Sequence, residues 1–153
     1  MTLASTVREK LSDWLPVAGR QELIVTADQG SVILSADRRE ELGCLVWEMT
    51  VRRQPAASDR LRAWAERIVG RVTGLLEPLK IVELDPERNE GILRSDKPSS
   101  RNEHVFYYEV FLRGTTEATL RRYQAPVHNG RRDQISFALT HDAIAKLAGD
   151  LAA

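Results

Sequence analysis

Apolar and polar positions alternate most clearly in the stretch from His104 to Gln124, which also contains its own turn. Aromatic and β-branched residues dominate this stretch, and that composition favours strands. A loop over residues 114–116 predicts an antiparallel hairpin. The predicted register pairs Arg113 with Glu117, Glu109 with Arg121, Val110 with Leu120, and Tyr107 with Tyr123. A register shifted by one residue loses both opposite-charge pairs, so the sequence favours this one.

The two faces of this hairpin differ less in polarity than the two faces of a sheet that has one side in solvent. The face predicted for the core carries Phe106, Tyr108, Val110, Leu112, Ala118 and Leu120. The outer face carries Val105, Tyr107, Phe111 and Tyr123 beside Glu109, Arg113, Thr119 and Arg121. Aromatic residues and arginine together are enriched at protein interfaces. Three explanations are open: one of the chain's own helices covers this face, the face forms a homodimer, or it binds another protein or a ligand.

Helical spacing of apolar residues occurs at three places. The first predicted helix begins with a Thr6–Glu9 capping box and ends at Pro16 and Gly19, the second runs from a cap at Ser58 or Asp59 to about Leu76, and the third is capped by Thr140. Gly70 and Gly74 in the second helix indicate either the close approach of another element or tolerated exposed glycines.

Segments rich in β-branched residues predict the remaining strands at 22–27, 31–36, 44–53, 80–84, 91–95 and 134–139. In the third of these, Leu45, Trp47, Met49 and Val51 are predicted to share one face. Three connections are also predicted: one helical turn at Arg38–Leu42, a mobile loop at Asp96–Glu103 and a tight turn at Asn129-Gly130.

The resulting order is α-βββ-α-βββββ-α, which predicts a mostly antiparallel α+β fold with three helices in a single domain, 1–153. This order of elements is similar to that of small dimeric secretion-chaperone-like α+β domains. The resemblance rests on architecture and not on a shared motif. It implies a dimeric domain and leaves the function to be argued from the site.

Composition narrows the class of protein. The 153 residues carry 22 basic and 22 acidic side chains, so no basic surplus points to nucleic acid or to an anionic membrane surface. No apolar run approaches the roughly 18 residues of a membrane span. Cys44 is the single cysteine and allows no disulfide within the chain, so we expect a cytoplasmic protein.

No pattern in the sequence predicts a catalytic, metal or cofactor site. The histidines His104, His128 and His141 lie far apart and lack ligand spacing, and Cys44 is best read as a small buried side chain. Residues 85–91 resemble a calcium loop only loosely, and a plain turn accounts for them better. Arg94 and Arg122 are the candidate ligands for an anion.

The leading hypothesis is therefore a non-enzymatic adaptor or chaperone-like domain, homodimeric, that binds a polypeptide through a sheet face. Its candidate partner-binding residues are Tyr107, Glu109, Phe111, Arg121 and Tyr123. The alternative is a small-molecule or anion-binding domain, or an unrecognised enzyme, with a pocket between the sheet and the long helix.

Overall fold

The computed structural model describes residues 2–14, 19–37, 43–128 and 130–153. Within them are three helices, α1 (Leu3–Asp13), α2 (Leu61–Arg71) and α3 (His141–Ala152). The strands are β1 (Gln21–Ala27), β2 (Gly30–Asp37), β3 (Gly43–Arg53), β4 (Leu79–Asp85), β5 (Glu90–Ser95), β6 (Ser99–Arg101), β7 (His104–Arg113), β8 (Glu117–Pro126), β9 (Asp133–Ile135) and β10 (Phe137–Thr140). The predicted α+β class and the order of helices and strands are confirmed, although seven strands rather than five lie between α2 and α3.

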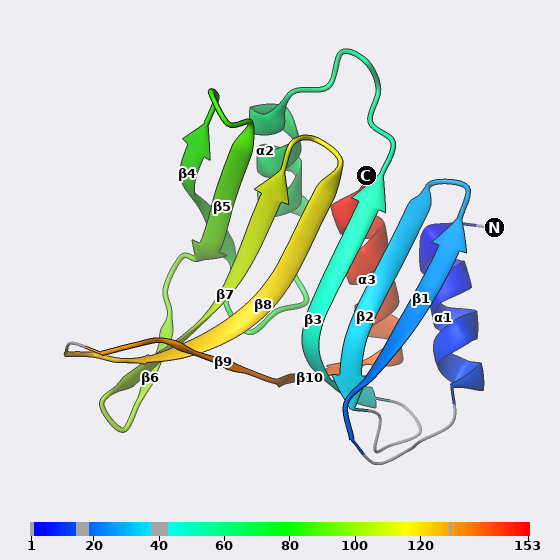
Figure 1. Cartoon of the computed structure of the whole chain (residues 1–153). Coiled ribbons are helices and arrows are strands. Elements are labelled where there is room, and N and C mark those ends of the chain that lie inside the picture. Colours follow the sequence, from blue (N-terminus) through cyan, green and yellow to red (C-terminus); the bar gives the residue numbers. More distant parts are fainter. Residues whose placement is uncertain (1, 15–18, 38–42, 129) are drawn as a thin grey trace.

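One antiparallel sheet contains all ten strands, and its main path runs β1-β2-β3-β8-β7-β5-β4 (Figure 1). The two halves of the path meet where β3 and β8 pair over only residues 49–52 and 117–120. Beyond this contact the strands separate, β3 pairing with β10 and β8 pairing with β9. The consecutive strands β9 and β10 therefore span the fork in the sheet.

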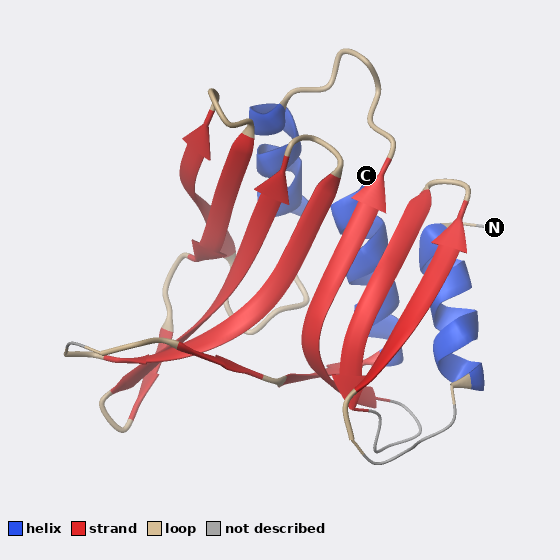
Figure 2. Cartoon of the chain, viewed as in Figure 1, coloured by secondary structure: helices blue, strands red, loops and turns tan. Residues whose placement is uncertain are grey.

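All three described helices lie on the same face of the sheet (Figure 2). Helices α1 and α3 pack on each other and on β1–β3, while α2 packs on β4 and β5. The core lies between these layers and includes Trp64 of α2, Leu11 of α1 and Ile144 of α3, each fully buried. The Trp64 indole N–H donates to the Leu151 carbonyl at 3.0 Å and ties α2 to α3.

Two predicted helix boundaries are wrong. Helix α1 begins at Leu3 with Thr2 as its N-cap, because the Thr2 hydroxyl accepts from the Ser5 N–H at 3.1 Å. Helix α2 ends at Arg71 rather than near Leu76, and its N-cap is Arg60 without a side-chain cap. The predicted cap of α3 is confirmed, since Thr140 accepts from the Ala143 N–H at 3.1 Å.

The predicted facing of β3 is wrong over its first half. Ser35 and Ala36 of β2 lie opposite Glu48 and Val46, so Trp47 is an extra residue in a β-bulge. The bulge reverses the alternation, so Cys44 and Val46 face the core with Met49 and Val51. Leu45 and Trp47 are only half-buried.

Two other segments differ from prediction. Residues 134–139 belong to two short strands rather than one, because β9 and β10 pair with different partners. The expected mobile loop at 96–103 contains β6, which pairs with β7. The helical turn predicted at 38–42, the helix end predicted at Pro16 and the turn residue Asn129 lie outside the described residues. No described helix has the length and apolar character needed to cross a membrane.

Candidate interaction face

The five predicted partner-binding residues share the sheet face opposite the helices, which we call the open face. They alternate with buried residues such as Tyr108, Val110 and Leu120, which pack into the core. None of the described helices lies on this side (Figure 2). Cover by the chain's own helices, the first of the three explanations, is therefore wrong for the described helices.

The predicted register of the β7–β8 hairpin is confirmed at every predicted pair. Tyr107 lies opposite Tyr123, and their ring centroids are 5.9 Å apart. Arg113 lies opposite Glu117, with 3.7 Å between the charged groups. The local pattern of the hairpin was sufficient to place these residues on one face.

On the open face the ladder partners Glu109 and Arg121 form ion pairs with other residues, whereas Arg113 pairs with Glu117 as predicted. Glu109 lies opposite Arg121 in the ladder, but its carboxylate accepts from Arg94 at 2.9 Å and from Arg132 at 2.7 Å. Arg121 instead donates to Glu48 of β3 at 2.9 Å. These pairs cross from β5 to β3 and connect the two halves of the sheet.

Arginine side chains partly cover the aromatic residues of the hairpin. The Arg132 guanidinium lies 3.8 Å from the centre of the Tyr123 ring, and Arg94 lies 5.5 Å from that of Tyr107. Hydrogen bonding to Glu109 is the main reason that the pKa of Arg132 lies above its ordinary value. Tyr123 is buried beneath this layer, while Tyr107 and Phe111 stay partly exposed. Sequence reasoning missed Arg132 as a member of this layer.

An apolar row crosses the open face at right angles to the strands. Its members lie directly opposite one another on successive strands, from β1 to β5: Ile24, Ile33, Thr50, Thr119, Phe111 and Ile92. The hydroxyls of Thr50 and Thr119 are 3.0 Å apart where the two halves of the sheet meet. The sequence signal for this row was a β-branched residue, or Phe111 in β7, at the outward position of each strand.

Charged rows flank the apolar row on both sides. On one side Glu117 pairs with Arg52 at 3.0 Å and with Arg113 at 3.7 Å. On the other side are the pairs of Glu48 with Arg121 and of Glu109 with Arg94. The open face therefore offers an apolar strip between two rows in which positive and negative charges alternate.

The two candidate anion ligands lie on opposite faces of the sheet, so they do not form one site. Arg94 is on the open face with Glu109, whereas Arg122 is buried on the core side. Arg122 donates to both Glu77 carboxylate oxygens, at 2.9 and 3.2 Å. Each guanidinium thus contacts a carboxylate of the protein itself, Glu109 for Arg94 and Glu77 for Arg122. The anion-binding hypothesis remains a prediction.

Glu77 is the centre of a buried polar network that sequence reasoning missed. Ser95 and Ser99 each donate to its carboxylate at 2.8 Å, in addition to Arg122. Burial raises the pKa of Glu77, but the hydrogen bonds from Arg122, Ser99 and Ser95 outweigh burial and hold it below its ordinary value. The Arg122 guanidinium also lies 4.1 Å from the centre of the Tyr108 ring. The network therefore connects Glu77, in the segment after α2, to the β7–β8 hairpin.

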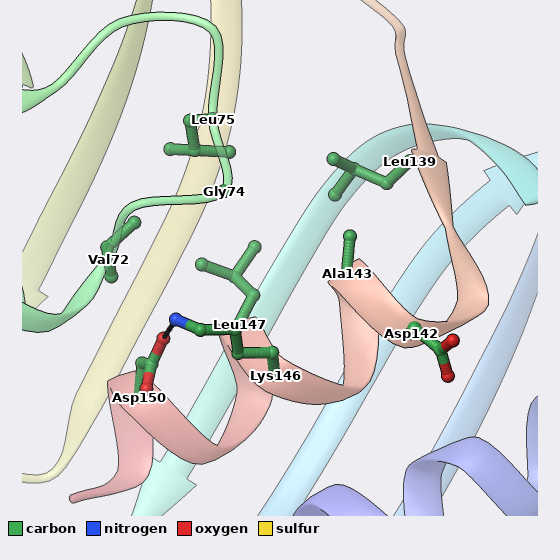
Figure 3. Close-up of a pocket in the computed structure, with 9 residues that line it drawn as sticks. All are labelled: Val72, Gly74, Leu75, Leu139, Asp142, Ala143, Lys146, Leu147 and Asp150. Carbon is green, nitrogen blue, oxygen red and sulfur yellow. Dashed lines mark hydrogen bonds and ion pairs between the residues drawn. The ribbon is translucent and has the colours of Figure 1, made fainter.

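An apolar groove of about 210 Å³ lies between α3 and the segment after α2 (Figure 3). Leu139, Ala143 and Leu147 line one wall, and Val72 and Leu75 line the other. Its polar rim is an ion pair of 2.6 Å between Lys146 and Asp150. A second hollow, of about 420 Å³, lies between the start of α2 and the β4–β5 turn and is lined by Leu61, Arg62, Leu84, Pro86 and Asn89. Neither hollow includes Arg94 or Arg122.

Within the described ranges, no three histidine, cysteine, aspartate or glutamate side chains come together in a way that could hold a metal ion. Cys44 is buried in β3, as expected for a small apolar side chain. Gly70 and Gly74 have open space where a Cβ would lie, so no close approach requires a glycine there.

Comparison with known proteins found no matching family model, no matching curated protein and no matching solved structure. The likeness to secretion-chaperone-like domains therefore remains an analogy in the order of elements.

Proposed function

We propose that this protein is a non-enzymatic adaptor or chaperone-like domain that binds a polypeptide through its open face. The observation that carries the proposal is the apolar row from Ile24 to Ile92, bordered by charged rows and free of the described helices. Phe111 supplies aromatic surface within this row, and the partly exposed Tyr107 supplies it beside the row.

The form of the surface favours a polypeptide over a small molecule. An apolar strip several strands long between rows of mixed charge matches a chain that presents apolar side chains with polar neighbours. A small ligand is normally held in a concave pocket. The charged groups of the open face are already bonded to one another, as in the pairs of Glu109 with Arg132 and of Glu48 with Arg121. They are therefore held in place for recognition before a partner arrives.

The same pairing argues against nucleic acid as the partner. Binding to phosphates requires basic side chains that can exchange counterions for the ligand. On the open face, Arg94, Arg121 and Arg132 each contact a carboxylate at 2.9 Å or less. A cytoplasmic location belongs to the proposal as well and rests on the single buried cysteine, Cys44. Fractionation of cells that produce the protein would test this location.

Selection of peptides from a random phage-displayed library against the full chain tests the function. Peptides that bind the wild-type protein should bind Phe111→Ser at least about tenfold more weakly, because the substitution interrupts the apolar row. Leu76→Ser is the matched control, since Leu76 is 80% exposed and lies outside the open face. Amide shifts on peptide addition should map to β7 and β8. Failure to enrich any peptide, or equal binding to both variants, would contradict the proposal.

A further inference from the structure

The two edges of the main sheet path differ in how they are protected. Strand β4 forms one edge, and its pairing with β5 skips Val82 in a bulge beside the exposed Lys80. Bulges and lysines are devices that prevent an edge strand from pairing with another chain. Strand β1 forms the other edge with seven residues in unbroken register, and it contains no lysine or proline. Edge β1 therefore carries neither a bulge nor a lysine against pairing with another chain.

The hairpin turn decides which backbone groups of β1 point outward. Ala27 lies opposite Gly30 across a two-residue turn, which makes them a hydrogen-bonded pair. Alternate residues back along the strand, such as Val25, bond to β2 in the same way. The backbone N–H and C=O groups of Glu22, Ile24 and Thr26 therefore point outward from the free edge of β1, in the plane of the sheet. Ile24, at the centre of the three, has a side chain that is 61% exposed.

We propose that the β1 edge pairs antiparallel with the β1 edge of a second copy of this chain, around a two-fold axis at Ile24. In this register Ile24 lies opposite the partner's Ile24, and Glu22 lies opposite the partner's Thr26. The outward backbone groups of these residues match, so they form hydrogen-bonded pairs without a shift of register.

Charge and packing also fit a second copy. Arg20 precedes β1 and Asp28 follows it, so antiparallel pairing brings opposite charges together at both ends of the contact. On the core side, the half-buried Leu23 meets the partner's Val25. Strand β1 thus matches a second copy of itself in hydrogen bonding, charge and apolar contact. A two-fold interface requires such a self-complementary surface.

Such a pairing would join the two open faces. The apolar row ends at Ile24 on β1, so the two-fold axis makes it continuous with the same row of the second copy. The dimer contact does not depend on what the open face binds. The two proposals can therefore fail separately.

Sedimentation velocity of the full chain from low to high micromolar concentration tests the contact. Wild-type protein should form a dimer, and Ile24→Lys should raise the dimer dissociation constant at least about tenfold, because two lysines would then lie opposite each other. Val82→Lys is the matched control, since it places the same charge at an exposed position on the other edge strand and should leave the dimer intact. Circular dichroism would check that both variants fold.

A cross-link tests the register independently of Ile24→Lys. Paired Cα atoms across a hydrogen-bonded position are about 5.5 Å apart, within the range that a disulfide spans. Ile24→Cys should therefore oxidise to a covalent dimer, whereas Val82→Cys should not. A chain that is monomeric at every concentration would overturn the inference. So would a dimer that Ile24→Lys leaves unchanged, or an edge that pairs only with added peptides.

Discussion

The guanidinium of Arg132 lies 3.8 Å from the centre of the Tyr123 ring and also donates to Glu109 at 2.7 Å. One side chain, from the segment before β9, thus covers an aromatic residue of β8 and neutralises a carboxylate of β7. This arrangement explains how Tyr123 and Glu109 are both buried on a face that none of the described helices covers. The cover consists of arginine side chains from β5 and from the segment before β9.

Removal of this cover should have a modest effect on stability. Arg132→Ala should lower the free energy of unfolding by about 1 kcal/mol, because a partly exposed cation–π contact and ion pair are lost while Arg94 still neutralises Glu109. Urea unfolding would measure the loss. The exposed neighbour Arg131→Ala makes the same change in net charge and should have little effect. Equal losses in both variants would contradict this role for Arg132.

The buried pair of Glu77 and Arg122 should be much more sensitive. Glu77→Gln should lower the free energy of unfolding by about 3–5 kcal/mol, because it leaves the buried Arg122 without its counter-charge. The double variant Glu77→Gln with Arg122→Met should recover part of this loss, since no unpaired charge remains. Thermal and urea unfolding would measure both variants. A double variant less stable than Glu77→Gln alone would show that burial of the lone charge is not the cause.

Asp59 should make stability depend on pH in the acid range. Hydrogen bonding to Arg67, against the effect of burial and with the help of Arg53, lowers its pKa to about 2. The pKa of Asp59 is lower in the folded state than in the unfolded state. Its contribution to the free energy of unfolding is therefore complete above about pH 4 and is lost as the pH falls toward about 2. The difference in unfolding free energy between wild type and Asp59→Asn should shrink over this window. The exposed Asp13→Asn should show no comparable change, and a difference independent of pH would contradict the assignment.

Two glycines should respond to alanine in opposite directions. Gly70 lies near the end of α2 with open space around its missing Cβ, so Gly70→Ala should stabilise by up to about 1 kcal/mol. Gly30 has a φ of +151°, and a Cβ there would meet the Arg52 carbonyl oxygen at 2.1 Å. Gly30→Ala should therefore destabilise the protein, with a clear fall in the midpoint of thermal unfolding. A destabilised Gly70→Ala would indicate a packing role that the structure does not contain.

Features that depend on near neighbours in the chain could be predicted from the sequence alone. The register of β7 with β8 follows from residues a few positions apart, with Tyr107 opposite Tyr123 and Arg113 opposite Glu117. The cap of α3 at Thr140 is equally local. Alternation and capping act over a few residues, so these predictions needed no knowledge of the rest of the fold.

The side of the sheet that the helices cover, and the distant groups that meet, depend on the packing of the whole fold. The bulge at Trp47 depends on pairing between β2 and β3, and it reversed a face that strict alternation had assigned. The Glu77–Arg122 pair joins residues 45 positions apart, and the Arg132 layer joins the segment before β9 to the hairpin. Such contacts form only when the packed core fixes the strands side by side, so no local pattern in the sequence encodes them. The open face thus has residues that the sequence predicted and a set of ion pairs that only the fold could assemble.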